Sequence, residues 1–304
     1  MTTRIGSLLH TTKRVVVFAV LLALLGLGVP AATHSQAQYA LIELDGVHGL
    51  DASDDVIWIL ALGSDARPGE PFLGSRSDAI QLVGIDAVTH HAVTIGIPRD
   101  SYVEIPGHGR DKINAAMVYG GPPATADAVA GLTGITPDYV FVTSFPGLIH
   151  MVGGINGVRA KVTYNMDDQG QVFHPGIHKF TGVEALAFAR IRHGLPGGDF
   201  DRSMDQGQLL KGGLGTIVSK LDRPGFFERA LELLAQNTDT NMNPVDLYRL
   251  ARTVLEVDPD RVKVCVVQGG TGYVGASSVV FPDVAAARSL ADDVRHDAQV
   301  DGGC

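Results

Sequence analysis

Residues 75–100, SRSDAIQLVGIDAVTHHAVTIGIPRD, contain two apolar runs rich in β-branched residues, joined by the polar stretch DAVTHH. Two such runs separated by turn-forming residues predict the strands of an antiparallel hairpin. Asp78 and Arg99 lie at equal distances along the chain from the point between Val88 and Thr89. A hairpin that turns at this point therefore brings the two opposite charges together at its open end.

The segment before the hairpin predicts a third strand at the same end of a sheet. Residues 56–63, VIWILALG, form a fully apolar run of strand length that ends in glycine, which is typical of a buried strand. This strand ends near Ser64, the next begins at Ala79, and the last ends at Pro98. If the three strands are neighbours, one end of the sheet collects a set of charged residues: Asp65, Arg76, Asp78, Arg99 and Asp100.

Strand patterns alternate with helix patterns over residues 55–300. Thr181 and Glu184 have the spacing of a capping box and predict a helix N-terminus, and a second long helix is expected from about Asp201 to Lys220. Such alternation predicts an α/β fold with a mixed central β-sheet and helices on both faces, a three-layer α/β/α arrangement.

The N-terminus has the pattern of an export segment. Residues 1–14 contain three basic residues and no acidic ones, and the next fifteen, VVVFAVLLALLGLGV, contain no polar side chain. We expect residues 1–34 to be an uncleaved membrane anchor, with a cleaved signal peptide as the alternative. Residues 35–54 then form a linker, and residues 55–300 form one domain outside the cytoplasm, held at the cell membrane by a single span or secreted after cleavage.

The charge of the chain argues against nucleic-acid binding. Three of the 24 Lys and Arg residues precede residue 35, so the exported part carries 21 basic residues against 33 acidic ones, a net charge of −12. A body of this sign repels polyanions. The only cysteines, Cys265 and Cys304, pair in one interpretation, and in the other remain a buried thiol and a free terminal thiol.

Two groups of polar residues suit a phosphate-containing ligand. Asp65 and Asp78 are carboxylates next to flexible loops, of the kind that hold Mg²⁺ together with phosphate oxygens. In ARIRHGLPGGDFDRSMDQ, Arg190 and Arg192 project to one side if the chain is extended there, and Arg202 and Gln206 share a helix face. Arginine binds phosphate oxygens through two hydrogen bonds at once, so these groups together predict a diphosphate site. A surface network of ion pairs among Arg190, Asp199, Asp201 and Arg202 is the alternative.

Several long motifs resemble the LytR–CpsA–Psr family. They are ILALGSDARPG, RSDAIQLVGID and VTIGIPRDSYVEIPGHGRDKINAAMVYGG, followed by FTGVEALAFARIRH and GGDFDR, and the resemblance covers about residues 55–297. It implies an exported phosphotransferase. Such enzymes take a glycopolymer such as teichoic acid, capsule or arabinogalactan from a polyprenyl-diphosphate carrier, join it to a peptidoglycan hydroxyl and release polyprenyl phosphate.

The resemblance also assigns roles to individual residues. It implies that Asp65 and Asp78 bind Mg²⁺. It implies a diphosphate-binding set of Arg76, Arg99, Arg190, Arg192, Arg202 and Gln206. It implies a catalytic set of Arg99, Arg190, Arg192 and Asp199, with either Asp78 or Asp199 accepting the proton of the attacking hydroxyl.

The chain departs from the family pattern at one point. Where the family commonly has Arg-Gln-Gln, this chain has Asp205-Gln206-Gly207. Residues three apart on a helix are neighbours, so we expect Asp205 to pair with Arg202. The same change keeps a second hypothesis open, a sensor or scaffold that binds polyprenyl diphosphate without turnover, and a third is hydrolysis of the diphosphate.

Overall fold

The computed structural model describes residues 56–66, 70–168, 170–192 and 194–304. The predicted N-terminal segment, residues 1–34, and the linker, residues 35–54, lie outside these ranges. Among the described residues, none of the helices combines the length and the apolar character that crossing a bilayer requires.

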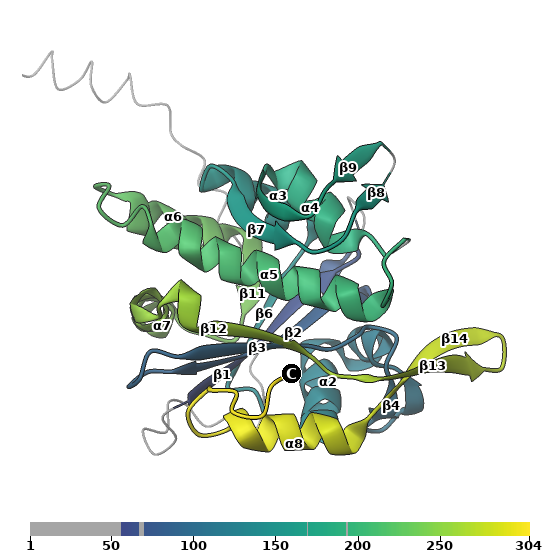
Figure 1. The fold of residues 1–304 in the computed structure, drawn as a ribbon. Coiled ribbons are helices and arrows are strands. Elements are labelled where there is room, and N and C mark those ends of the chain that lie inside the picture. The colour runs from purple at the N-terminus through teal and green to yellow at the C-terminus, as the bar shows by residue number, and fades with distance from the viewer. Residues whose placement is uncertain (1–55, 67–69, 169, 193) are drawn as a thin grey trace, which may run out of the picture. The chain divides into compact units, whose positions relative to one another are not determined.

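A mixed sheet forms the centre of the fold (Figure 1). Within the described residues it has six strands in the order β11-β6-β1-β2-β3-β12. Their bounds are β1 (Val56–Ser64), β2 (Ser77–Asp86), β3 (Ala92–Gly96), β6 (Tyr139–Thr143), β11 (Thr238–Thr240) and β12 (Val262–Val266). β1–β2, β2–β3 and β6–β11 are antiparallel, whereas β1–β6 and β3–β12 are parallel. The predicted mixed central sheet is confirmed.

The hairpin of β2 and β3 has the register that the sequence predicts. Ile85 pairs with Ala92 across the hairpin, which places the turn at Val88 and Thr89. Asp86 stabilises this turn, because its Oδ1 accepts hydrogen bonds from the backbone N–H groups of Val88 and Thr89 at 2.7 and 2.8 Å. These side-chain hydrogen bonds hold the turn. Because the turn sets the register of β2 against β3, it also fixes which residues meet at the open end of the hairpin.

Helices cover both faces of the sheet (Figure 1). Alternating residues of the strands enter two different clusters. Leu60, Leu62 and Ile80 pack with α2 and α8, whereas Ile59 and Ile85 pack with α7. α5 lies on the α7 side, against β2, β3 and β12. The helices are α2 (Ala116–Thr133), α3 (Phe145–Gly154), α4 (Gly182–Arg190), α5 (Asp199–Val218), α6 (Phe226–Asn237), α7 (Pro244–Glu256) and α8 (Val284–Val294).

α2 contains a break that the sequence explains. Gly120 and Gly121 have non-helical backbone angles, with a φ of 68° at Gly121, and Pro122 and Pro123 follow. Glycine adopts a positive φ without strain, and proline suits the start of a new helical stretch. The short helical stretch before the break and the longer one after it therefore correspond to the two separate helix patterns, DKINAAMVYGG and TADAVAGLTGI, of the sequence.

In the described part of the chain, four two-stranded ribbons lie outside the central sheet. They are β4 (Tyr102–Ile105) with β5 (Gly109–Lys112), β7 (Val158–Val162) with β10 (Gly176–Phe180), β8 (Met166–Asp168) with β9 (Gln171–Phe173), and β13 (Gly269–Val274) with β14 (Ser277–Pro282). Short 3₁₀ turns lie at Phe72–Gly74, Ile113–Ala115 and Pro259–Arg261. The β13–β14 ribbon projects beyond the sheet (Figure 1).

A disulfide joins Cys265, which is buried in β12, to Cys304. Of the two interpretations of these cysteines, the structure shows the pair. The bond links residues 39 apart in sequence and ties the chain after α8 to the central sheet.

Removing the disulfide should lower stability. Closing a loop of this length restricts the unfolded chain, and the chain-entropy model gives about 4 kcal/mol, with typical values of about 2–4 kcal/mol. We expect Cys304→Ser to lower the free energy of unfolding by about 2–4 kcal/mol, measured by urea titration. A reducing agent should destabilise the wild type to the same level and leave Cys304→Ser unchanged. Equal stability of variant and wild type under oxidising conditions would contradict the expectation.

Candidate functional site

The open end of the β2–β3 hairpin carries an ion pair between Asp78 and Arg99. Both side chains are mostly buried, with 16% and 17% of their surface exposed. The symmetric positions of the two residues about the turn predict this contact, and the structure confirms it. Burial lowers the pKa of Arg99, but the charge and hydrogen bond of Asp78 outweigh this effect, so the net pKa of Arg99 is raised. The guanidinium remains a cation.

Asp65 follows β1 at the same end of the sheet. Its backbone N–H donates to the carbonyl oxygen of Arg76 at 2.9 Å, which holds the loop after β1 against the residue that precedes β2. Burial and then the negative charge of Asp78 raise the pKa of Asp65. The two carboxylates predicted to bind a metal therefore lie close enough to repel each other.

The two carboxylates fit Mg²⁺. This ion keeps several of its waters and is commonly held by one or two carboxylates plus substrate phosphates. The described residues contain no group of three or more His, Cys, Asp or Glu side chains arranged to hold a metal. Asp65 and Asp78 are two carboxylates that could hold Mg²⁺ together with phosphate oxygens, and a divalent cation would relieve the repulsion between them.

The first turn of α5 brings a second ion pair to this end of the sheet. Arg202 pairs with Asp199, and the Arg202 side chain is only 3% exposed. The Oδ2 atom of Asp199 also accepts a hydrogen bond from the backbone N–H of Asp100 at 3.3 Å, directly after Arg99. A carboxylate in the first turn of a helix is favoured by the helix dipole. Asp199 therefore connects α5 to the hairpin end.

Gln206 connects three segments of the site. Its Nε2 donates to the carbonyl oxygen of Asp78 at 3.2 Å and to that of Ala189 at 3.0 Å. α5 is thereby joined to β2 and to the end of α4, next to Arg190. Gln206 therefore binds backbone carbonyl groups, and these bonds fix the positions of the charged side chains of Asp78 and Arg190 relative to α5.

The arginines form a cationic cluster with free donor capacity. Burial and the positive charges of Arg99 and Arg192 lower the pKa of Arg202, although Asp199 opposes this. The three guanidinium groups are thus close enough to repel one another. The buried Nε atoms of Arg99 and Arg202 have no hydrogen-bond partner among the described residues. Buried donors without partners are costly, so an anion bound here gains these hydrogen bonds.

Arg190, Arg192 and Arg76 are exposed, and Arg192 lies close enough to Arg202 to lower its pKa. α4 ends at Arg190, and Ile191 is buried with extended backbone angles, φ −58° and ψ 134°. Arg190, the last residue of α4, and Arg192 are both exposed on either side of it, and the projection of both side chains to one side stays a prediction. The Arg190 guanidinium lies 4.6 Å from the ring centre of Phe145, a contact that the sequence did not indicate. Arg76 is exposed and contributes a positive charge near Asp65.

The expected Arg202–Asp205 pair is wrong, because Arg202 pairs with Asp199 instead. Asp205 is 2% exposed, and its Oδ2 has no hydrogen-bond partner in the described part of the chain. Burial, with a smaller contribution from the charge of Asp201, raises the pKa of Asp205 to about 8. The carboxyl is therefore largely neutral at pH 7 and adds little negative charge beside the arginines.

The sequence also missed Lys112. Its Nζ lies 3.0 Å from Oδ1 of Asp100 and connects the end of β5 to the loop that carries Arg99. Nothing local distinguishes a lysine at this position from one on a solvated surface, because the contact depends on how the β4–β5 ribbon folds back.

Asp205 should make the stability of the protein depend on pH. In the unfolded chain this carboxyl ionises near 3.8, whereas in the fold it holds its proton until about pH 8. The protonated carboxyl contributes its full stabilisation below pH 3.8, its pKa in the unfolded chain. The free energy of unfolding then falls as the pH rises to about 8, by up to roughly 1.4 kcal/mol per pH unit. We expect Asp205→Asn to gain stability relative to wild type between pH 5 and pH 8, measured by urea unfolding. A difference that is the same at both pH values would contradict this.

Comparisons with known proteins agree with the geometry. Residues 30–295 match the model of the LytR_cpsA_psr family. The chain is 29% identical over 202 residues to TagU of Bacillus anthracis, which is named a polyisoprenyl-teichoic acid–peptidoglycan teichoic acid transferase. This match covers 66% of the chain and 65% of that protein. TagT of Bacillus subtilis, a transferase of the same name, is 33% identical over 213 residues, covering 66% of the chain and 64% of TagT.

A solved structure shares the fold. A crystal structure titled "TagT bound to LI-WTA" superposes with a TM-score of 0.67 and 26% identity, covering 83% of the chain and 94% of that structure. The chain thus spans about 65% of the length of the curated TagU protein and most of the solved TagT structure.

Proposed function

Because the chain belongs to the LytR–CpsA–Psr family, we propose that it is a Mg²⁺-dependent phosphotransferase acting outside the cytoplasm. It moves a cell-wall glycopolymer from a polyprenyl-diphosphate carrier to a hydroxyl group of peptidoglycan. The observation that carries the proposal is the convergence of Arg99, Arg202 and Arg192 at one end of the sheet, where two buried guanidinium Nε donors have no partner within the part of the chain that the structure describes.

The transfer exchanges one phosphorus–oxygen bond for another. An acceptor hydroxyl oxygen attacks the phosphorus on the polymer side of the diphosphate. The bond to the bridging oxygen breaks, and polyprenyl phosphate leaves. Negative charge develops on this leaving group, and the arginine cluster stabilises it by hydrogen bonds and by charge.

The chain's own residues divide this work by position. Arg99 and Arg202 are buried and held by Asp78 and Asp199, so their donors are oriented before the ligand binds. Arg76, Arg190 and Arg192 lie at the exposed side, where they reach the outer phosphate oxygens. Such preorganised donors lower the barrier because they need not reorient during the reaction. Asp78 or Asp199 accepts the proton of the attacking hydroxyl.

Asp65 and Asp78 would hold Mg²⁺ in the loaded enzyme. The ion would supply neutralisation of the diphosphate charge. Arg99 pairs with Asp78 and keeps that carboxylate oriented toward the site.

The compartment and the membrane attachment are part of the proposal. The disulfide between Cys265 and Cys304 supports an oxidising environment, as outside the cytoplasm. The apolar N-terminal segment supports attachment to the membrane that contains the lipid carrier. An isoprenoid-linked donor is then delivered along the membrane surface.

Non-catalytic binding has no specific observation in its favour. The Asp205 substitution motivated that hypothesis, but this carboxyl is buried and largely neutral at pH 7. Hydrolysis of the diphosphate is distinguished from transfer by its products, because only transfer links the polymer to peptidoglycan.

Arg190→Ala and Arg192→Ala should each reduce transfer by a factor of 10 or more, since each removes a charge-assisted hydrogen bond to the phosphates. The assay combines purified protein, lipid-linked glycopolymer, Mg²⁺ and a soluble peptidoglycan oligomer, and quantifies linked polymer and polyprenyl phosphate. Arg223→Ala, an exposed arginine between α5 and α6, is the matched control and should keep wild-type turnover. Wild-type rates in both test variants would remove these arginines from the mechanism.

Asp65→Asn should raise the Mg²⁺ concentration needed for half-maximal transfer at least tenfold, because it removes one of two carboxylates. Chelation of the wild type should abolish transfer, and added Mg²⁺ should restore it. The raised pKa of Asp65 adds a pH dependence, because protonation of this carboxylate at lower pH weakens its metal binding. Unchanged activity in the presence of excess chelator would exclude the metal role.

A further inference from the structure

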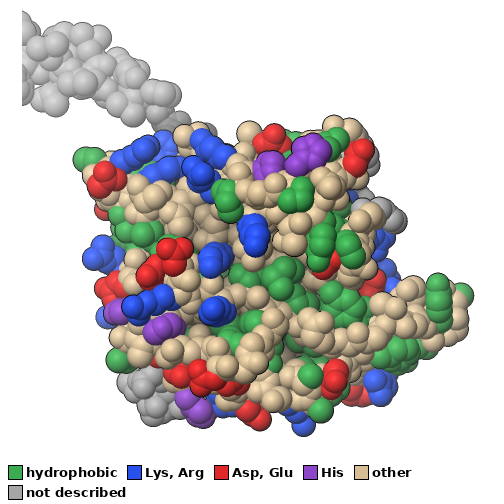
Figure 2. Space-filling model, viewed as in Figure 1, with side chains coloured by type: hydrophobic (Ala, Val, Ile, Leu, Met, Phe, Trp, Pro, Cys, Tyr) green, Lys and Arg blue, Asp and Glu red, His purple; other side chains and the backbone are tan. Residues whose placement is uncertain are grey.

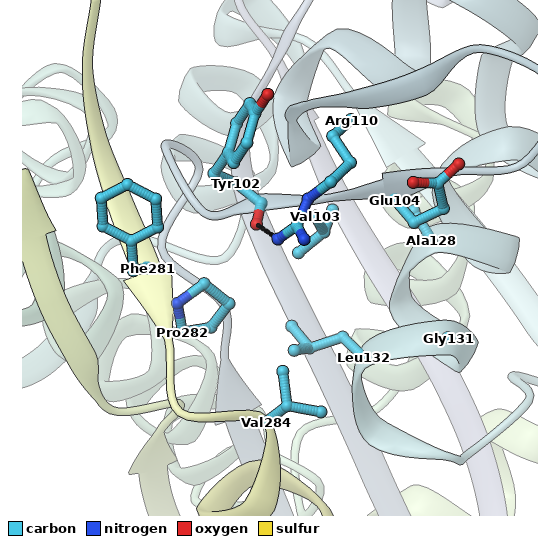
Figure 3. Close-up of a pocket in the computed structure, with 10 residues that line it drawn as sticks. All are labelled: Tyr102, Val103, Glu104, Arg110, Ala128, Gly131, Leu132, Phe281, Pro282 and Val284. Atoms are coloured by element: carbon cyan, nitrogen blue, oxygen red, sulfur yellow. Dashed lines mark hydrogen bonds between the residues drawn. The ribbon is translucent and has the colours of Figure 1, made fainter. Parts of the chain in front are cut away.

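A pocket of about 270 Å³ lies on the other side of the loop that carries Arg99. Its walls come from the β4–β5 ribbon, the second half of α2, and the junction of β14 and α8. Figure 3 shows Phe281 and Pro282 facing Leu132 across the pocket, with Tyr102 and Arg110 at one end and Val284 at the other. Its volume is close to the lower end of the range for small-ligand pockets, about 300–1,000 Å³.

One short segment of chain links the pocket lining to the phosphate site. Tyr102 lies three residues after Arg99, so their Cα atoms are at most about 11 Å apart. The segment is fixed at both sides. The backbone N–H of Val280 donates to the carbonyl oxygen of Asp100 at 2.9 Å, and Lys112 pairs with the Asp100 carboxylate. A ligand in the pocket therefore lies within reach of the proposed transfer site.

The lining combines aromatic rings with paired polar groups. The ring centre of Phe281 lies 6.2 Å from that of Tyr102 in an edge-to-face arrangement, and Phe281 remains 42% exposed. The Arg110 guanidinium lies 5.2 Å from the Tyr102 ring centre and donates to the Tyr102 carbonyl oxygen at 3.3 Å. Glu104 lies opposite Arg110 in the β4–β5 register. The lining thus contains one acidic and one basic side chain.

We propose that this pocket binds a sugar ring of the peptidoglycan acceptor, an N-acetylhexosamine. The exposed ring of Phe281 offers a flat apolar face to the sugar, the apolar wall of Leu132 and Val284 accommodates the acetyl methyl group, and Arg110 with Glu104 bonds hydroxyl and amide groups. The inference rests on the proposed function, since it names where the acceptor of that reaction lies.

Charge favours the acceptor sugar over the polymer of the donor. The named relatives TagU and TagT transfer teichoic acid, a polyanion. The pocket lining contains one acidic and one basic side chain, so it offers no net positive charge to attract such a chain. A neutral sugar requires no such charge. The donor is in any case held by its diphosphate at the arginine cluster, whereas the acceptor has no charge there to hold it and requires contacts of its own.

The β13–β14 ribbon supplies a matched control. Figure 2 shows hydrophobic side chains on this ribbon where it projects at the right of the molecule. Tyr273, 74% exposed, lies on the same ribbon as Phe281 but does not line the pocket. Replacing Tyr273 therefore removes an exposed aromatic ring of the same ribbon without altering the pocket.

The experiment measures sugar binding and transfer separately. Chitotetraose, an uncharged N-acetylglucosamine oligomer, is titrated against the full chain by calorimetry. Phe281→Ala and Arg110→Ala should each weaken its binding at least fivefold, whereas Phe281→Tyr and Tyr273→Ala should bind as the wild type does. In the transfer assay, the two alanine variants should raise KM for the peptidoglycan oligomer at least fivefold, with kcat and KM for the lipid-linked donor unchanged.

The outcomes separate the two proposals. Wild-type chitotetraose binding in both alanine variants, or no binding by the wild type at millimolar sugar, would overturn the pocket assignment. A raised KM for the donor alone would overturn it too, because the pocket would then hold a sugar of the donor. If neither the wild type nor any variant transfers polymer, but Phe281→Ala and Arg110→Ala weaken sugar binding as expected, the pocket assignment stands and the transferase proposal fails.

Discussion

The close packing of α5 on the sheet is the constraint on which the proposed site depends. Gly207 faces β3 and β12, and a Cβ atom there would lie 2.5 Å from Cγ1 of Val264 and 2.8 Å from Oγ1 of Thr94. From the strand side, a Cβ on Gly96 would lie 3.0 Å from the carbonyl oxygen of Ser203. Real side chains do not approach as closely as 2.5 Å, so Gly207 is needed for α5 to lie where it does, and at Gly96 a side chain would require Ser203 to shift by a few tenths of an ångström. The short distance between α5 and the sheet also allows a hydrogen bond, in which Gln81 Nε2 donates to the Ser203 carbonyl oxygen at 2.9 Å.

This packing explains how the two ion pairs come together. Arg202 and Gln206 lie on the buried side of α5 beside Gly207, and a helix displaced outward would withdraw both from the hairpin end. Gln206 would lose its bond to the Asp78 carbonyl, and Asp199 its bond to the backbone of Asp100. The residues Asp205 and Gly207, at which the chain departs from the family pattern, are therefore consistent with each other. The glycine allows close contact, and the burial that results keeps the neighbouring Asp205 carboxyl protonated at neutral pH.

The sequence predicted the parts of the fold and site that depend on local pattern. The β2–β3 register follows from the positions of two apolar runs about a turn, and the Asp78–Arg99 contact follows from that register. The extended chain at Ile191 separates Arg190 from Arg192 as expected. The partner of Arg202 was predicted wrongly, because Asp199 and Asp205 both lie three residues from it. Helical spacing alone cannot distinguish the two, and burial against the sheet decides between them.

The β4–β5 and β13–β14 ribbons were not predicted, and the reason is physical. The β4 and β5 strands have only four residues each, with three consecutive charges in β5, and β13 carries three glycines, so the pairing of both ribbons depends on the surfaces against which they fold. Ser101 bridges to Val280 because the loop after β3 and the strand before α8 meet there, residues 179 positions apart. The same long-range meeting builds the pocket beside Arg99. The proposed transfer requires a binding surface for each of two large substrates. In this chain the local hairpin pattern forms the proposed phosphate end, whereas the proposed acceptor pocket arises from tertiary contacts.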